Sequence, residues 1–572
     1  MRPTRLASIA ILALLLAAVI VPAVSHGHPE RVSTFPDLDL GHVPRVRHTG
    51  KAIYVCKADS AARIRFQFSG RQERHRLRQL KLCRFRNIQA AVNHARSGYR
   101  IRILPGVYKE RPSRRTPVGS FGSGPCANDY VETEGFTNTA PPPSGPRSND
   151  PPVRPDRNFQ LNCPNSKNLI EVTGDTRPEP DPTNPTTPKC LQLCNLQIEG
   201  LGSEPKKVKI VGDRKKLDVL RIDRANGIVI RNLLVEQSAF NGIDLVEVDG
   251  FRVVDVIARY NQDYGVLSFT SERGLYNRVE AYRNGDSGVY PGSNQKGCVP
   301  AGGYPTRGDG TCGSNPGSIS QCGPTTTEIR NSNSHHNVLG YSGTAGNSVY
   351  MHDNRFHHNS AGISTDSFAS GHPGMPQECV HWTDNAVYSN NNNFFTAANQ
   401  QFCQATPFED RKRRHVCPQF QVPVGVGILL GGANRNLVDS NQIYDNWRYG
   451  ILLFAVPAGL RGDNDPAHQQ DTSNGNRVMD NLMGVGPGGP NPNGVDIEWD
   501  ESGQGNCFEG NSGPGGAAVS SAPGSLPACP GSAVWAPPNP AVSGPLVPCA
   551  AWDPANAQMP PGCDWFVTPP EP

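Results

Sequence analysis

Side chains that transfer protons near neutral pH gather in one stretch of the sequence, residues 331–372. Loops held by a rigid scaffold often carry such groups, and a Gly-His-Pro-Gly sequence lies within this stretch. We therefore predict an acid/base or metal site here. The alternative is structural, with paired histidines replacing asparagine and bonding the backbone. The candidate catalytic residues are His335, His336, Asp366 and His372.

A second acidic stretch lies nearer the C-terminus, where Asp496, Glu498 and Asp500 alternate with apolar residues. In a strand, this alternation places all three carboxylates on one side. Carboxylates this close repel one another unless a cation or an arginine neutralises them. Because oxygen ligands suit Ca²⁺, the three residues are predicted metal ligands and Ca²⁺ a predicted cofactor. A solvated edge, or pairing with Arg448, is the alternative.

The element that must position these residues is a short repeat that begins near residue 226. An asparagine is followed three or four positions later by a glycine and an aliphatic residue, and glycines recur every 22 to 24 residues, as at Gly242, Gly265 and Gly288. Such a period marks repeats that stack on their neighbours. It accommodates two or three short strands with their turns, which is one coil of a parallel β-helix. The asparagines are predicted to form a ladder from coil to coil.

The glycine of each coil also predicts which side chains leave the core. The residue after it, such as Val266 or Ile363, points inward, and the second and fourth residues point outward. Coils lie about 4.8 Å apart, so the outward side chains line one long face. Tyr290, which stands in an outward row, and Tyr341 are the predicted substrate-binding residues.

A different pattern precedes the repeats. Ile88, Ala91 and Val92 share one face of a short predicted helix, and an alternating strand follows it and ends at Pro105-Gly106. An amphipathic helix leading into the first strand covers the open end of a solenoid core.

The segment from Ile88 to Tyr108 resembles the capping segment of pectin-lyase-like right-handed parallel β-helix proteins, in which a helix of IQAA type precedes a strand ending PGxY. The repeats also resemble the short β-helix repeats of NosD-like proteins and mannuronan-epimerase-type modules. The resemblance implies an all-β fold, a right-handed parallel β-helix with an N-terminal helical cap. Fold alone does not deliver function, since the superfamily contains lyases, hydrolases, epimerases and non-enzymatic proteins.

The resemblance implies action on a polysaccharide, by a lyase or epimerase before a hydrolase. The diagnostic motifs are missing: there is no adjacent Asp-Asp pair, no Asn-Thr-Asp, no vWiDH sequence of pectate lyases and no Tyr-Gly-Phe-Asp-Pro-His. A non-catalytic cell-surface or matrix protein that binds glycan is therefore the second hypothesis. A NosD-like metal-handling role is third, because the soft-ligand clusters that copper prefers are missing.

Composition places the chain in an oxidising compartment. Basic residues and an apolar stretch precede a predicted signal-peptide cut after Ser25, so we expect a secreted, extracellular protein. Sixteen cysteines allow up to eight disulfides, and the Cys190–Cys194 spacing is assigned to a disulfide rather than to zinc.

The predicted segments are a signal peptide (1–25), a leader (26–50), a cap and first coil (51–110), a Pro/Ser/Asn-rich insertion (111–190), the parallel β-helix (191–510) and a disulfide-stapled irregular segment (511–572).

Charge limits the partners. Without Arg2 and Arg5 the 55 basic residues become 53 against 51 acidic, so nucleic acid is not indicated. A basic run over residues 63–86 could attract an acidic polymer, but a solvated surface near the N-terminal cap is the favoured interpretation. No segment beyond the signal is apolar enough for membrane insertion. We expect a monomer that meets a polysaccharide, with acidic chains among the candidates.

Overall fold

The structure is a computed structural model. It describes residues 33–36, 42–110, 168–181, 184–214, 217–295, 322, 325–368, 372–406, 410–411, 415–461, 463, 465–550 and 561–572. The predicted signal peptide, most of the predicted insertion, and Cys126, Cys163, Cys298 and Cys312 lie outside these residues.

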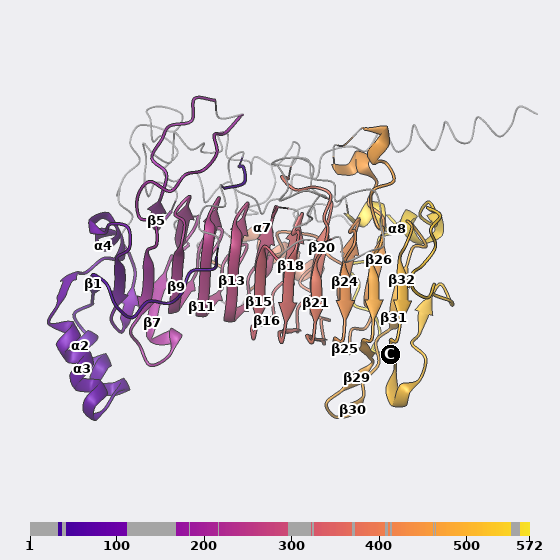
Figure 1. Ribbon diagram of the computed structural model, residues 1–572. Helices are drawn as coiled ribbons and strands as arrows, with labels where there is room; N and C mark the ends of the chain where they lie inside the picture. The colour runs from indigo at the N-terminus through magenta and orange to yellow at the C-terminus, as the bar shows by residue number, and fades with distance from the viewer. Residues whose placement is uncertain are drawn as a thin grey trace, which may run out of the picture.

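Each coil of the chain contributes one strand to a smaller sheet and then one or two strands to a larger one. In one coil these are β17 (Leu339–Thr344), β18 (Val349–His352) and β19 (Arg355–His357). All pairings between successive coils are parallel, for example β17 with β20 (Ala361–Asp366). Connections between parallel strands of one sheet are right-handed. The chain is thus a right-handed parallel β-helix, seen along its length in Figure 1.

We call the eleven-stranded sheet sheet 1. Its strands, in spatial order, are β5 (Ile170–Thr173), β8 (Leu220–Asp223), β10 (Ile243–Val246), β12 (Val266–Phe269), β14 (Ser287–Gly292), β17, β20, β23 (Val426–Gly431), β26 (Tyr449–Phe454), β31 (Val495–Trp499) and β33 (Ser521–Ala522).

In the described part of the chain, sheet 2 has twenty strands. They are β1 (Ala52–Val55), β2 (Cys83–Phe85), β3 (Arg100–Ile103), β4 (Gly106–Tyr108), β6 (Gln197–Gly200), β7 (Val208–Val211), β9 (Ile228–Glu236), β11 (Asp249–Arg259), β13 (Glu272–Tyr282), β15 (Thr327–Arg330), β16 (Asn333–His335), β18, β19, β21 (His381–Thr383), β22 (Ala386–Tyr388), β24 (Leu437–Asp439), β25 (Gln442–Tyr444), β27 (Arg477–Met479), β28 (Leu482–Met483) and β32 (Cys507–Glu509). A short hairpin joins β29 (Val485–Gly486) to β30 (Gly489–Pro490).

Sheet 2 bends where one residue per coil has a left-handed backbone, as at Arg278, Asn331 and Asp353. The bend divides it into sheet 2a, which contains β15, β18, β21 and β24, and sheet 2b, which contains β16, β19, β22 and β25. Sheets 1, 2a and 2b enclose one apolar core.

The core confirms most of the predicted inward positions. Val266, Ile363 and Ile451 are at most 1% exposed. They belong to one row of residues that are paired from strand to strand along sheet 1. The last coil differs from the prediction, because Ile497 rather than Val495 continues this row. Gly494 serves the preceding turn instead, since a Cβ there would lie 2.2 Å from the Trp447 carbonyl oxygen.

Asparagine ladders hold the coils in register, as predicted. The Oδ1 of Asn359 accepts from the backbone N of Asn337 at 2.9 Å and from its Nδ2 at 3.3 Å, and the Nδ2 of Asn359 donates to Asn390 at 3.0 Å. Each amide thus bonds the coils on both sides. This ladder consists of Asn261, Asn284, Asn337, Asn359, Asn390, Asn446 and Asn493.

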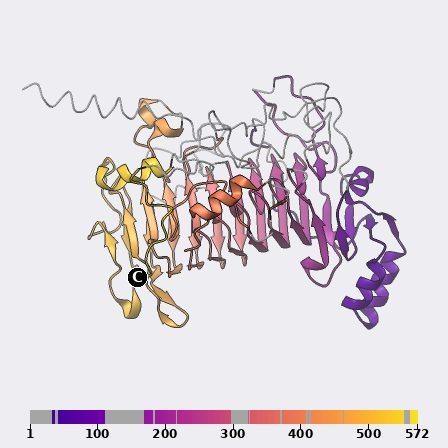
Figure 2. The same cartoon turned by 180° about the vertical axis from the view of Figure 1, so that it is seen from behind.

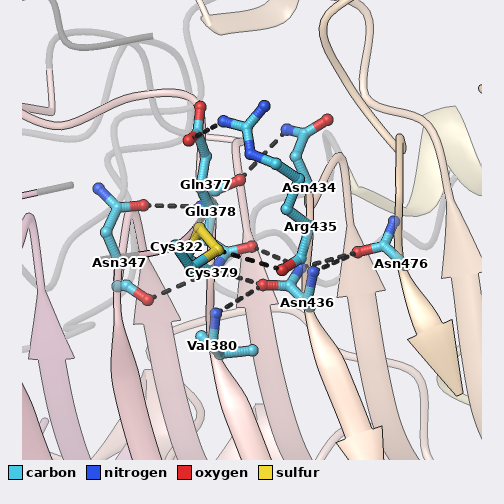
Figure 3. Close-up of a disulfide and its surroundings, with 11 residues drawn as sticks. Cys322, Asn347, Gln377, Glu378, Cys379, Val380, Asn434, Arg435, Asn436 and Asn476 are labelled. Carbon is cyan, nitrogen blue, oxygen red and sulfur yellow. Dashed lines mark hydrogen bonds and ion pairs between the residues drawn. A yellow bond between two sulfur atoms is a disulfide. The ribbon is translucent and has the colours of Figure 1, made fainter. Parts of the chain in front are cut away.

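Two further ladders follow the other turns. One runs from Asn354 through Asn385 and Asn441 to the later coils. Figure 3 shows the other, in which Gln377 bonds Asn436 and Asn436 bonds Asn476 beside the Cys322–Cys379 disulfide.

The N-terminal cap is the predicted one. Helix α4 (Ile88–His94) buries its apolar face against the first coil, while α2 (Ser60–Gln67) and α3 (Gly70–Leu80) project from the same end (Figure 1). The leader is not loose where it is described. Thr34 donates to Glu247 Oε1 at 2.7 Å and the Pro44 carbonyl accepts from Arg252, so this part runs along the solenoid.

The C-terminal segment is stapled, as predicted, by Cys507–Cys529 and Cys549–Cys563, and it contains helix α8 (Pro540–Ala550). The Cys190–Cys194 disulfide is confirmed too. The solenoid begins before residue 191, because β1, β3 and β5 already belong to its sheets. In the described part of the chain, no helix is long and apolar enough to cross a membrane.

Candidate functional site

The outward rows of sheet 1 point away from the core as predicted, but they are covered. Leu267, Tyr290, Ser342 and Leu452 are between 0% and 5% exposed. Towards the C-terminal end, outward apolar residues of β23 and β26 pack against chain that folds back over them, including Phe395, Val416, Val424, Trp565 and Phe566. Figure 2 shows helix α7 (Ala397–Ala405) lying across the strands. Among the described residues, the outward side chains from β12 to β26 are therefore closed off from solvent.

One segment of this cover, residues 415–424, is called the strap below. Its Gln419 N donates to the Gly285 carbonyl at 2.9 Å, so the strap reaches back across several coils. Nearby, buried Arg411 donates to Gln262 at 3.1 Å. The Cys403–Cys417 disulfide closes the loop that begins at α7 and leads into the strap.

Beneath this cover, three aspartates and two tyrosines form a buried group that we call the acidic row. Asp263 and Tyr264 precede β12, Asp286 and Tyr290 lie at β14, and Asp366 ends β20, two strands further along sheet 1. The rings of Tyr264 and Tyr290 lie 4.6 Å apart. The Tyr264 phenol and the Ser287 hydroxyl, the latter at 3.0 Å, donate to Asp286. Asp366 accepts from the backbone N of Phe368 at 3.1 Å.

Burial moves the pKa values of these acids towards neutrality. It raises the pKa of Asp286 to about 7, against the opposing effect of the Ser287 and Tyr264 hydrogen bonds. It raises the pKa of Asp366 to about 6. The pKa of Asp263 is raised well above its usual value, first by burial and then by the negative charges of Asp286 and Asp218. Carboxyl groups shifted in this way mark candidate active sites.

Asp263 is the least satisfied member of the acidic row. It is 1% exposed, and neither carboxylate oxygen has a hydrogen-bond partner among the described residues. Burying such a group costs stability, and an acidic neighbour adds to the cost. Asp263 and Asp286 are not among the predicted site residues. A signal was available, since each stands two residues before a repeat glycine and the two are 23 residues apart.

The predicted catalytic residues fall into two separate places. Asp366 ends β20 in sheet 1, and His372 packs edge-on against Phe269 with ring centroids 5.4 Å apart. Phe269 belongs to the same row of sheet 1 as Thr344 and Asp366, three strands away. His335 and His336 lie instead at the end of β16 in sheet 2b, where the coil turns.

The two predicted sugar-binding tyrosines are both fully buried. Tyr341 points inward and packs edge-on against Trp382, with ring centroids 5.7 Å apart, so it supports the core rather than a sugar. Tyr290 points outward but belongs to the acidic row beneath the cover. The physical reason for the difference is strand alternation, since Tyr341 follows the repeat glycine directly.

The histidine pairs stack from coil to coil, as their spacing predicts. His335 lies over His357 at 5.1 Å and His336 over His358 at 5.3 Å, with ring planes within 9°. Within each pair the two Nδ1 atoms are 2.8 Å apart. The histidines do not replace ladder asparagines, because Asn337 and Asn359 follow them and keep that place.

Sheet 2a carries a second set of proton-transfer groups, and these are partly exposed. His352 lies 3.1 Å from Glu328 Oε1, and His381 lies 2.8 Å from Asp439 Oδ1. The ring of Tyr350 lies 4.6 Å from His352 and 5.1 Å from His381. Only the coil register, hidden in the sequence by insertions of unequal length, brings these residues together.

The three predicted calcium ligands leave the last coil on one side, with Ile497 in the core, as expected. Asp496 accepts from Ser520 N and Oγ, both at 2.9 Å, and Asp500 accepts from the backbone N of Ala455 at 2.8 Å. Burial raises the pKa of Glu498 to about 7. Arg448, the alternative partner, pairs with Asp564 instead, at 2.7 Å.

Elsewhere in the described chain, one group of side chains has the spacing of a metal site: Asp463, His468 and Asp471. His468 Nδ1 already lies 2.9 Å from Asp463 Oδ2, which accounts for their approach as an ion pair. The ligand atoms of Asp496, Glu498 and Asp500 do not converge in this way.

Comparison with known proteins gives similarity in structure only. No protein-family model matches the sequence, and no curated protein matches it either. The similar solved structures include the A-module of a mannuronan C-5 epimerase of Azotobacter vinelandii (12% identity, 74% of this chain, 94% of that chain, TM-score 0.33). A pectate lyase, Pel9A, has 12% identity, 84% and 82% coverage and a TM-score of 0.31.

The tailspike protein of the Escherichia coli bacteriophage HK620, solved with a pentasaccharide, has 12% identity, 75% and 63% coverage and a TM-score of 0.37. The shared feature is the parallel β-helix. Scores at this level carry no information about activity, which has to be argued from the site.

Proposed function

We propose that this protein is a secreted, extracellular enzyme that acts on a uronate-containing polysaccharide, as a lyase or an epimerase, at the acidic row of sheet 1. The observation that supports this most is the pair Asp286 and Asp366, two carboxyl groups whose pKa values lie at about 7 and about 6. Such acids are largely protonated in mildly acidic solution. The six disulfides of the described chain support an oxidising compartment.

A protonated carboxyl group has a specific use with such a substrate. Removing the proton next to a uronate carboxylate places negative charge on that carboxylate, and a neutral acid that donates a hydrogen bond stabilises it. Asp286 or Asp366 would supply this bond. The site then needs a base for the carbon-bound proton, and His372 is the imidazole nearest to this row in chain order.

The two reactions share this first step and differ in the second. In an epimerase, a proton returns to the same carbon from the opposite face, and the phenols of Tyr264 and Tyr290 are the available donors. In a lyase, the bond from the neighbouring carbon to the glycosidic oxygen breaks, a double bond forms, and the departing oxygen takes the proton.

A hydrolase fits less well. Both inverting and retaining glycosidases pair a protonated acid with a second carboxylate that is ionised. In the acidic row all three aspartates are buried and all three pKa values are raised. None of them is favoured as the ionised partner.

A non-catalytic glycan-binding protein is the second candidate, because the acidic row is covered while sheet 2a is open. Tyr350, His352 and His381 are partly exposed on one face along the axis, where a sugar chain could lie. This candidate places the ligand on a different side of the solenoid. Substitutions in the acidic row and in sheet 2a therefore distinguish the enzyme from the binding protein.

The test is turnover of polyuronates and of neutral polysaccharides, followed by absorbance of unsaturated products, by reducing ends and by nuclear magnetic resonance for epimerisation. We expect activity on polyuronates alone, lost in Asp286→Ala and Asp366→Ala. Asp286→Asn should retain part of the activity, because an amide still donates a hydrogen bond. If Asp286 instead donated a proton to the substrate, Asp286→Asn and Asp286→Ala would lose activity equally.

Asp439→Asn on sheet 2a is the matched control and should leave turnover unchanged. Release of reducing ends without unsaturated product would identify a hydrolase. Glycan binding without turnover, weakened by Tyr350→Ala but not by Asp366→Ala, would replace the proposal with the binding protein.

A further inference from the structure

The turn between sheet 2b and sheet 1 carries two rows of side chains whose residue types change along the solenoid. The first row is Glu236, Arg259, Tyr282, His335, His357, Tyr388 and Tyr444. From Tyr282 onward its rings stack at 4.8 to 5.1 Å. The second row is the residue after each of these, always with a left-handed backbone: Gln237, Tyr260, Arg283, His336, His358, Ser389 and Asp445.

Neither row requires histidine. Tyrosine satisfies the stacking in the first row on both sides of the histidines, and serine, aspartate and arginine satisfy the backbone in the second. Yet both rows change to histidine together in two consecutive coils. Stacking and turn geometry therefore leave the four imidazoles unexplained.

The atoms that face each other within a pair are both Nδ1, at 2.8 Å in each coil. With metal–nitrogen bonds of about 2.0–2.1 Å, two nitrogens at this separation subtend about 85° at an ion. This angle fits two adjacent positions of a tetragonal ion such as Cu²⁺ or Ni²⁺, and it is narrow for tetrahedral Zn²⁺.

The outer nitrogens of the two first-row histidines face oxygen acceptors of the kind that orient metal-binding histidines. His357 Nε2 lies 2.9 Å from Asn333 Oδ1, and His335 Nε2 lies 3.7 Å from Glu280 Oε1. The Asn333 acceptor holds the proton of His357 on Nε2, and the nearby Glu280 carboxylate favours the same tautomer of His335, so the Nδ1 lone pair of each faces the partner imidazole. The pairs are also accessible, because His335, His336 and His357 are partly exposed and His358 is exposed.

We propose that each histidine pair, His335–His336 and His357–His358, chelates one tetragonal divalent cation, Cu²⁺ or Ni²⁺, through its two Nδ1 atoms. The hydrogen bond now joining the two Nδ1 atoms gives way to the ion, and the displaced proton moves to Nε2 or to solvent. The second ion binds more weakly, since two dications one coil apart repel each other. This site is independent of the acidic row.

The experiment titrates the tag-free protein with Cu²⁺ and records calorimetry together with electron paramagnetic resonance. We expect up to two ions per chain and hyperfine coupling to two nitrogens. His335→Tyr with His357→Tyr should weaken binding at least tenfold while keeping the ring stack, because Tyr282 and Tyr388 occupy the same row. His336→Ser with His358→Ser should do the same and keep the turn, as Ser389 does.

His381→Gln is the matched control, a histidine on the neighbouring sheet face, and should leave the titration unchanged. Unchanged Cu²⁺ affinity in either double variant would overturn the chelate. So would loss of the signal in His468→Gln, which would place the ion at Asp463, His468 and Asp471. Circular dichroism of each variant checks the fold before any titration is interpreted.

Discussion

The phenol of Tyr264 donates a hydrogen bond to Asp286, which stands 22 residues later and one coil further along the solenoid. The bond favours the ionised carboxylate, whereas burial favours the neutral acid, and burial prevails because the pKa of Asp286 still rises to about 7. The acid is therefore balanced between its two forms near physiological pH.

The first prediction is a pH dependence of stability. The folded pKa values of Asp286 and Asp366 exceed the unfolded value near 4, so the folded state binds more protons between pH 4 and about 7. The stabilisation is complete below about pH 4 and is lost as the pH rises through 6 to 7. Thermal melts should show a wild type more stable at pH 5 than at pH 8. Asp286→Asn with Asp366→Asn should flatten this difference, and an unchanged slope would contradict the assignment.

The second prediction concerns Asp263, which is buried without a hydrogen-bond partner among the described residues. Asp263→Asn removes the charge and its repulsion with Asp286 at nearly constant shape. We expect the free energy of unfolding at pH 8 to rise by about 1–3 kcal/mol. Denaturant titration measures it. A loss of stability would mean that a cation pairs with Asp263, or that a water molecule hydrogen-bonds to it, in solution.

The third prediction tests the ladders. Asn359→Ala removes the amide that accepts from Asn337 and donates to Asn390, and so leaves buried groups of both coils without partners. We expect a loss of about 2–4 kcal/mol in the free energy of unfolding. Asn93→Ala, at an exposed position of α4, is the control and should change it by less than about 0.5 kcal/mol. Equal effects of the two substitutions would show that the asparagine ladder does not stabilise the fold.

The fourth prediction concerns calcium at Asp496, Glu498 and Asp500, which stays a prediction. If the ion binds, added Ca²⁺ should raise the melting temperature, and chelator should reverse the rise. The corresponding stabilisation is about 2.7 kcal/mol at a hundredfold excess of Ca²⁺ over Kd. Glu498→Gln would then abolish the response. If chelator leaves the wild type unchanged, Glu498→Gln should simply raise stability at pH 8, because burial disfavours the Glu498 charge.

Most of the fold is predictable from the sequence because its cause is local and repeated. Each coil uses the same asparagine, glycine and aliphatic positions, so the period, the inward row and the ladder follow from a few residues. The exception is the last coil, where Gly494 resembles a repeat glycine but serves a turn. The helices α2 and α3 were not anticipated, since they lie outside the repeat.

The candidate site is less predictable because it depends on what the insertions do. Alternation correctly places Tyr290 and Asp366 on the outside of sheet 1, yet nothing in the pattern indicates that the strap and the C-terminal segment lie over this face. Insertions of unequal length also hide the coil register that brings His381 to Asp439. Sequence spacing alone therefore groups His335 with Asp366, although the two lie on different faces.

The left-handed row at the turn before sheet 1 has a consequence for what the solenoid can be made to carry. Its seven residues range from glutamine to aspartate, so the backbone there accepts almost any side chain while the coils keep their spacing of about 4.8 Å. Each coil of the rigid solenoid therefore offers one turn position that tolerates substitution. Charged, ligating or reactive side chains introduced there by substitution would be aligned along the axis with one per coil, and the core would need no redesign.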